Sequence, residues 1–250
     1  MFSHSIEKHC RELDRCNQRG GRMLSVADLI EADTMPLALA AAVTACVASG
    51  ASFMVGANPG GAGKTTVMCA LLNFIPADVD IVPATPKILC QATTTSSARR
   101  CCYLCHEIGS GPYYAYLWGQ ALRQYCSLGD KGHILATNLH ADTLAETEEQ
   151  VCGVNQVPRN HFHNFPLLLF LRVSHSSRVI QQTYISNDGA PHALAYDASQ
   201  GLFKPKMFAT SEKRQICQQF LENFLAQPDR TIEAMRRAAL NAPALAEMFR

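Results

Sequence analysis

The sequence has little net charge and few aromatic residues. Its 250 residues carry 22 Lys and Arg against 21 Asp and Glu, a formal net charge of +1, and a single Trp. Nucleic-acid-binding proteins normally have a clear basic excess, so we expect no nucleic-acid partner. Only 17% of the residues are charged and 48% are hydrophobic, which is enough to bury a sizeable core. A disordered tail or a small disulfide-bonded scaffold is therefore not expected.

Signals for export are also missing. Residues Met1–Arg22 are polar and charged and lack the apolar stretch of a signal peptide. We therefore interpret the 11 cysteines as reduced thiols of a cytoplasmic protein. The apolar run Leu37–Gly56 has the length that a bilayer requires, but Ser49-Gly50 interrupts it. A helix that ends near Ser49, followed by a buried strand from Ser52 to Gly56, explains this run better than a membrane span.

The order of the remaining segments predicts a parallel α/β core with an antiparallel ribbon and helices behind it. The segments expected after Gly56 are a helix at Lys64–Phe74, strands at Asp78–Val82, Cys101–Glu107 and His133–Asn138, a loop at Gln91–Arg100, and helices at Pro112–Cys126 and from Thr143. Three strand-like runs follow between residues 167 and 197, with a hairpin signal at Asn187-Asp188-Gly189. The chain from Ser211 onward is expected to be helical.

A glycine-rich turn between an expected strand and helix is the strongest functional signal. It reads Asn58-Pro59-Gly60-Gly61-Ala62-Gly63-Lys64-Thr65-Thr66 and fits the phosphate-loop pattern, except that Asn58 stands at the first glycine position. Asparagine tolerates a left-handed backbone, so the turn remains feasible. Lys64 is expected to reach the β- and γ-phosphates of ATP, and the Thr65 hydroxyl to bind Mg²⁺. The predicted nucleotide-binding residues are Asn58, Gly60, Gly61, Ala62, Gly63, Lys64, Thr65 and Thr66.

Two later strands supply candidates for catalysis. A phosphate-loop site needs an acidic residue at the end of a neighbouring strand, and Glu107 ends the segment Cys101–Glu107. The segment Gly132–Asp142 (GHILATNLHAD) places His133 and His140 seven residues apart across another strand. A histidine at the exit of that strand can sense a γ-phosphate by hydrogen bonding. We predict Glu107, His133 and His140 as catalytic residues.

These motifs, in this order, resemble the secretion ATPases that power type II and type IV secretion, type IV pili and archaeal flagella. The segment Gly132–Asp142 is similar to the family's histidine box, and Leu104–Ile108 is similar to its acidic strand. Arg172-Val173 and Arg178-Val179 resemble the strand block that follows. The resemblance implies a RecA-like P-loop core at 37–206, between a helical segment at 1–36 and another at 207–250. It also implies that Glu107 is the Walker B carboxylate.

The resemblance further implies what such a chain works with. Members form six-membered rings that couple ATP hydrolysis to movement of a membrane-embedded platform protein. We therefore expect a cytoplasmic homo-oligomer, hexameric and peripheral at the inner face of the membrane, with ATP and Mg²⁺ as cofactors.

The sequence also departs from the family. The family's arginine after Glu-Ile is Gly109 here, and the acidic box before the acidic strand is reduced to Asp78-Val79-Asp80. Arg99 and Arg100 are candidates for the missing arginine. Two alternatives to a motor therefore stay open. One is a non-catalytic nucleotide-binding subunit that regulates an assembly, and the other is a P-loop kinase for a small molecule.

Overall fold

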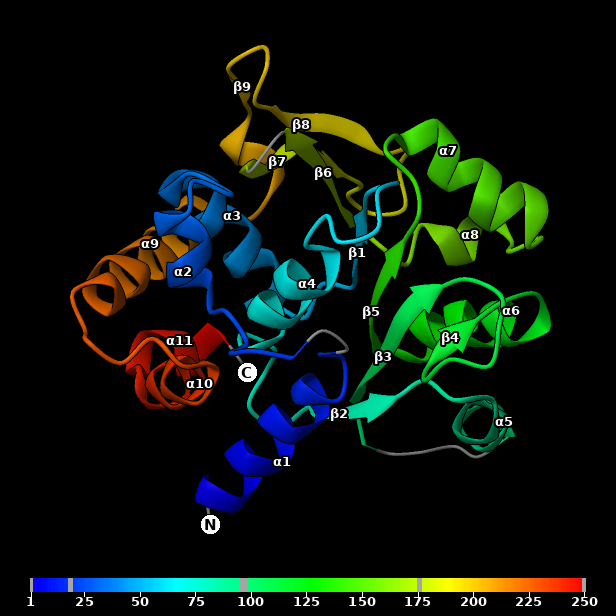
Figure 1. Ribbon diagram of the computed structural model, residues 1–250, viewed down its shortest axis with the longest axis horizontal. Coiled ribbons are helices and arrows are strands. Elements are labelled where there is room, and N and C mark those ends of the chain that lie inside the picture. Colours follow the sequence, from blue (N-terminus) through cyan, green and yellow to red (C-terminus); the bar gives the residue numbers. More distant parts are fainter. Residues whose placement is uncertain (1, 18–19, 95–98, 175–176, 249–250) are drawn as a thin grey trace.

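Helices and strands alternate through most of the chain in the computed structural model, which describes residues 2–17, 20–94, 99–174 and 177–248 (Figure 1). The α-helices are α1 (Phe2–Asp14), α2 (Val26–Glu31), α3 (Leu37–Ala48), α4 (Lys64–Leu72), α5 (Pro86–Thr94), α6 (Gln120–Ser127), α7 (Leu144–Glu148), α8 (Arg159–Phe162), α9 (Ser211–Leu225), α10 (Ile232–Asn241) and α11 (Pro243–Met248). The strands are β1 (Phe53–Gly56), β2 (Asp80–Pro83), β3 (Cys101–Ile108), β4 (Tyr116–Leu117), β5 (Ile134–Leu139), β6 (Leu167–Ser174), β7 (Ser177–Ile185), β8 (Ala193–Asp197) and β9 (Leu202–Phe203). Shorter turns of helix are η1 (Leu128–Lys131), the π-helical η2 (Glu149–Val154) and η3 (Pro205–Met207).

The described strands form one mixed sheet in the order β2-β3-β5-β1-β6-β7-β8-β9, with β4 beside the end of β3. The first five strands of this order are parallel, and the pairs from β6 to β9 are antiparallel. The expected mixed α/β architecture with a mostly parallel core and an antiparallel block is thus confirmed. Because β1 and β5 are neighbours, the loops that leave their carboxyl ends lie side by side.

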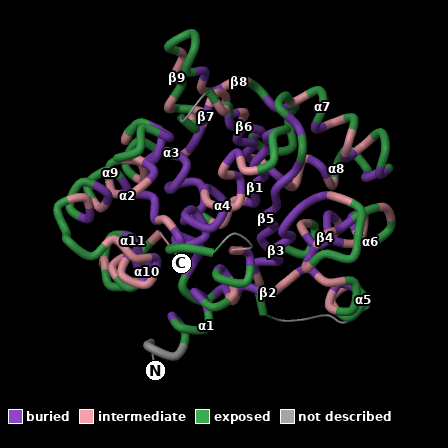
Figure 2. Tube along the Cα trace, viewed as in Figure 1, coloured by how far each residue is buried: buried purple, intermediate pink, exposed green. Residues whose placement is uncertain are grey.

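Both faces of the parallel strands are buried, which explains their continuous apolar runs. Successive residues of β1 point to opposite faces, so Phe53 and Val55 join one apolar cluster and Met54 joins another. Helices α2, α3, α4 and α9 cover the first face, and α5, α6 and α8 cover the second (Figure 1). Figure 2 shows the same arrangement as a buried centre flanked by helices that are exposed on their outer sides.

Local signals account for several element ends. Helix α2 starts at a capping box in which the Ser25 amide donates to the Asp28 carboxylate at 2.7 Å. Helix α3 begins after Pro36 and ends before Ser49, so the expected helix and the strand after it are confirmed. Pro36 caps this helix instead of lying in its first turn. In the described part of the chain no helix is long and apolar enough to cross a membrane.

The C-terminal helices pack on the core that surrounds α4. Cys217 and Leu221 of α9, and Met235 of α10, belong to the same apolar cluster as Phe53 and Val55 of β1. The buried guanidinium of Arg236 donates hydrogen bonds to the backbone carbonyls that follow α4. Helix α10 is therefore hydrogen-bonded to the segment that directly follows the helix carrying Lys64.

Two predicted segments are wrong. Residues 91–94 belong to helix α5 and are not a loop, because Leu89 buries one face of this helix against the sheet; residues 95–98 of the same segment lie outside the described residues. The expected helix at Pro112–Cys126 forms only in its second half, as α6. Its aromatic first half instead forms β4, which pairs with Glu107 and Ile108 at the end of β3.

Candidate active site

A cleft opens where β1, β3 and β5 end. It has a volume of about 590 Å³, within the range of small-molecule sites. The loop from β1 contributes Gly60 through Thr66, β3 contributes His106 and Glu107, and the exit of β5 contributes His140. The parallel order of the sheet brings these three segments together, because carboxyl ends of parallel strands share one edge.

The glycine-rich turn has the backbone that its sequence predicts. Gly61 and Gly63 have φ angles of 83° and 93°, a region that favours glycine. Gly63 is the N-cap of α4, so the amides of Lys64, Thr65 and Thr66 lie in the first helical turn, where no intrahelical acceptor exists. Together with the helix dipole, such amides form a site for an anion.

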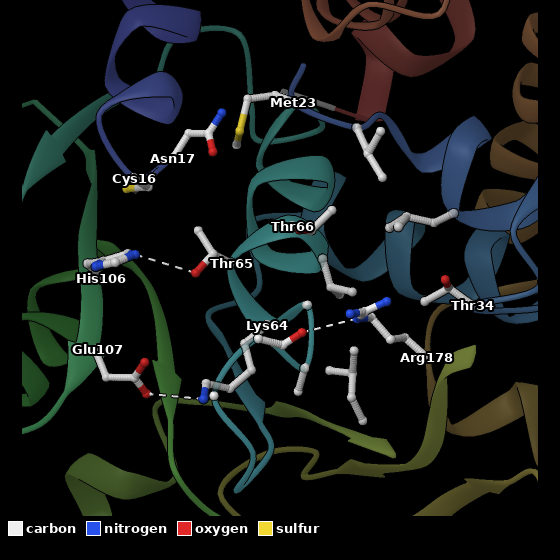
Figure 3. A pocket seen from close by; sticks show the side chains of 18 of the residues that line it. Cys16, Asn17, Met23, Thr34, Lys64, Thr65, Thr66, His106, Glu107 and Arg178 are labelled. Carbon is white, nitrogen blue, oxygen red and sulfur yellow. Dashed lines mark hydrogen bonds and ion pairs between the residues drawn. The ribbon is translucent and has the colours of Figure 1, made fainter. Parts of the chain in front are cut away.

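Lys64 is the first residue of α4, and its side chain is buried. Its Nζ donates to the Ala57 carbonyl at 3.0 Å and lies 3.7 Å from Glu107 Oε1 (Figure 3). Burial lowers the pKa of Lys64, although the Glu107 carboxylate acts in the opposite direction. The ammonium has one carbonyl hydrogen bond, one long ion pair and a 3.4 Å contact with His140 Nδ1, so a bound phosphate would be a stronger partner.

Glu107 is buried at the end of β3, and its Oε1 accepts no hydrogen bond among the described residues. Burial raises the pKa of Glu107, and the neighbouring Lys64 and His140 lower it in part. A buried carboxylate oxygen without a hydrogen bond is costly in a folded protein, and the ion pair with Lys64 offsets part of this cost. Because its pKa is raised, the Glu107 carboxylate is also better suited to accept a proton from a water molecule.

His140 follows β5 and stands between the loop and Glu107. Its Nδ1 lies 2.9 Å from the Asn58 carbonyl and 3.4 Å from Lys64 Nζ, while its Nε2 lies 3.9 Å from Glu107 Oε2. The two Nδ1 contacts require opposite protonation states of that nitrogen. The shorter contact favours an Nδ1–H that donates to Asn58, which directs Nε2 toward Glu107 and the cleft.

Two side-chain nitrogen atoms lie close to the hydroxyl of Thr65. Its Oγ1 accepts from Asn138 Nδ2 at 3.3 Å and lies 3.4 Å from His106 Nε2 (Figure 3). The Asn138 amide also donates to the His106 carbonyl at 2.9 Å, which ties β5 to β3 beside the threonine. Burial lowers the pKa of His106, opposed by a backbone hydrogen bond to Cys16.

Asn58 closes the loop from outside the cleft. Its backbone amide donates to Asp142 Oδ1 at 2.7 Å, and its side-chain amide donates to Asp142 Oδ2 at 2.9 Å and Glu146 Oε2 at 3.3 Å. Asn58 thus links the turn to the start of α7. It does not line the cleft, so its position does not support the predicted direct contact with the nucleotide.

His133 is not brought to the cleft. It precedes β5, where its Nδ1 accepts from the Cys101 amide at 3.2 Å and its ring packs edge-on against Tyr103. Six residues of strand, about 20 Å, separate it from His140. The spacing of seven puts the two histidines at opposite ends of β5, so they do not form one box.

The proposed substitutes for the missing acidic box and arginine also lie at the wrong end of the sheet. Asp80 begins β2 and pairs with Lys8 at 3.2 Å and Arg99 at 3.3 Å. Arg100 donates to the carbonyls of Gly50 and Gly132 at 3.1 and 2.9 Å. Since these residues stand where β2 and β3 begin, none of them lines the cleft.

Sequence reasoning missed part of the cleft wall. Arg178, at the start of β7, donates from Nε to the Gly61 carbonyl at 3.0 Å and lines the cleft. The segment between α1 and α2 contributes Cys16, Asn17 and Met23 to the opposite wall (Figure 3). The Arg-Val pattern was a signal for Arg178, whereas nothing in the sequence placed the first segment over the glycine-rich turn.

Comparisons with known proteins place the chain only distantly. No protein-family model and no curated protein match it. Among solved structures it is similar to the VirB11 ATPase from the Brucella suis type IV secretion system, crystallised in complex with sulphate. The TM-score is 0.44 and the identity 17%, over 57% of this chain and 50% of that one. A likeness of this extent, spanning half of the VirB11 chain, carries no argument about function.

Proposed function

We propose that this chain binds ATP with a divalent cation in the cleft and hydrolyses it. The observation that carries the proposal is the position of Lys64. It is buried at the first residue of α4, behind Gly61 and Gly63 at positive φ, and lies 3.7 Å from the carboxylate of Glu107. An ammonium, the amides of a first helical turn and a carboxylate with one oxygen lacking a hydrogen bond meet here, and the first two are what a phosphate site uses.

Each residue has a role that follows from its contacts. The amides of the glycine-rich turn and Lys64 would hold the β- and γ-phosphates. Glu107 would orient the attacking water and accept its proton, for which its raised pKa suits it. His140 directs Nε2 into the cleft, where this nitrogen would accept a hydrogen bond from a water beside the γ-phosphate, and would donate to the phosphate itself only when protonated.

The residues fit a cation that arrives with the nucleotide. The Thr65 hydroxyl stands beside the first-turn amides and is the group that would hold Mg²⁺. When bound, the cation neutralises the charge that develops on the phosphates. Among the described residues no group of three His, Cys, Asp or Glu side chains could hold a metal ion alone, so phosphate oxygens are needed to complete the site.

The proposals about the type of core fold and the type of motor rest on the sequence motifs. We propose a RecA-like P-loop core and a motor subunit of the secretion or pilus type, working as a homo-hexameric ring in the cytoplasm on a membrane-embedded platform protein. Its support is the order of three motifs, the glycine-rich turn, Glu107 and the Gly132–Asp142 segment. The absence of an arginine at Gly109 favours the alternative, a nucleotide-binding subunit that regulates an assembly without turnover.

The test is ATP binding and phosphate release by the purified chain. Lys64→Ala should abolish both, because the phosphates lose their cationic partner. Glu107→Gln should retain binding and lose about 10²- to 10⁴-fold in turnover, the usual effect of removing a general base. Lys87→Ala removes an exposed lysine of α5 and serves as the matched control.

The outcomes separate the alternatives. Binding without turnover in the wild-type chain would favour the regulatory subunit. ATP binding that is unchanged in Lys64→Ala would refute the proposed site.

A further inference from the structure

The residue next to Thr65 is unusual for a phosphate-loop site. In such sites the cation is held by the loop Ser or Thr together with a carboxylate from the neighbouring strand. Here His106 of β3 takes the place beside Thr65, with its Nε2 3.4 Å from Oγ1, and both residues line the cleft (Figure 3).

The other groups near Thr65 do not replace the missing carboxylate. Asn138 presents its amide nitrogen to Oγ1 at 3.3 Å, and an N–H donor cannot bind a cation. The carboxylate of Glu107 also lines the cleft, but it faces Lys64 at 3.7 Å and His140 at 3.9 Å. The protein group best placed to join Thr65 around a cation is therefore the imidazole of His106.

The distance between the two groups suits a shared cation. Two neighbouring ligands at about 2.1 Å from an octahedral ion are separated by about 3.0 Å. The observed separation of 3.4 Å reaches that value with a shift of a few tenths of an ångström. The facing atom is a ring nitrogen, and imidazole nitrogens are common metal ligands.

We infer that the cation of the bound nucleotide is coordinated by His106 Nε2 together with Thr65 Oγ1, and that the site selects Mn²⁺ over Mg²⁺. This inference rests on the proposed nucleotide binding. Mg²⁺ binds almost only oxygen ligands, whereas Mn²⁺, a transition metal that also favours oxygen, accepts an imidazole nitrogen more readily. Replacing a carboxylate by an imidazole at one position therefore weakens Mg²⁺ binding and retains Mn²⁺, which accepts both ligand types.

Two measurements test the inference. The first is the dissociation constant of ATP in the presence of Mn²⁺ and of Mg²⁺, by calorimetry. The wild-type chain should bind ATP at least tenfold more tightly with Mn²⁺. His106→Asp restores an oxygen ligand and should shift this ratio toward Mg²⁺ by about 10- to 100-fold, the usual scale for changes around a metal site. His106→Asn, which also offers an oxygen, provides a second variant should the aspartate prevent folding.

The second measurement is pulsed electron paramagnetic resonance of Mn²⁺–ATP on protein labelled with ¹⁵N in histidine. A ¹⁵N coupling is expected in the wild type and in the control His133→Asn, and should disappear in His106→Asp. Label in the protein separates histidine from the nitrogens of adenine.

ATP binding with no ¹⁵N coupling and no preference for Mn²⁺ would overturn the inference and leave the proposed function intact. No ATP binding with either cation would overturn the proposed function as well.

Discussion

Arg236 of α10 allows a test of how the C-terminal helices stabilise α4, the helix that carries Lys64. Its side chain on α10 is only 3% exposed, and its Nη1 donates to the carbonyls of Asn73 and Ile75 at 2.9 and 2.6 Å. Both carbonyls lie just after α4, where backbone acceptors have no intrahelical donor. Arg236→Met keeps the apolar length of the side chain and removes the donors.

The expected loss of stability follows from these contacts. Each buried carbonyl left without a donor costs about 1–3 kcal/mol. Removing the charge offsets part of this loss, since burial lowers the pKa of Arg236 from 12.5 to about 10. A buried guanidinium without a carboxylate partner is itself unfavourable. We therefore expect a net loss of about 2 kcal/mol in the free energy of unfolding.

The assay is urea unfolding followed by circular dichroism. With an m-value of about 2–3 kcal/mol/M, the midpoint of Arg236→Met should fall by about 0.7–1 M. Arg237→Met alters the exposed neighbour on the same helix and should stay within about 0.5 kcal/mol of the wild type. Equal midpoints for the two variants, at unchanged m-value, would refute the idea that Arg236 fastens α10 to the end of α4.

Two further predictions concern a buried acid and a glycine. Hydrogen bonds from the side chains of Ser199 and Gln182 lower the pKa of Asp197 to about 2, below its ordinary 3.8. This stabilisation is complete above about pH 4 and is lost as the pH falls toward 2, so Asp197→Asn should be less stable at pH 7 and the gap in urea midpoint should shrink below pH 4. A gap that stays constant down to pH 2.5 would contradict this account. Gly63→Ala forces a Cβ into φ 93° and within 3.3 Å of Arg178 Cδ, and should weaken ATP binding by about tenfold, from a strain of about 1–2 kcal/mol. Gly60→Ala has open space and no positive φ and is the control, so equal affinities of the two variants would argue against the strain.

Local features of this chain could be predicted from the sequence because they depend on short-range chemistry. Gly61 and Gly63 of the turn adopt the positive φ that glycine tolerates easily, and Ser25 with Asp28 starts a helix as its spacing predicts. The Asn187-Asp188-Gly189 signal lies between two antiparallel strands, β7 and β8. The central strands could also be predicted, because burial on both faces of the sheet requires a continuous apolar run.

The tertiary structure alone decided which of these features meet. Residues His133 and His140 share one motif, yet the direction of β5 sends them to opposite ends of the sheet. Residues Asp80 and Arg99 pair with each other because β2 and β3 begin side by side. By contrast, His106 and Thr65 are 41 positions apart but face one another, because β3 ends and α4 begins at the same edge of the sheet. Sequence periodicity encodes which face of an element is buried, but the strand order determines which ends become neighbours, and the strand order is set by the packing of the whole chain.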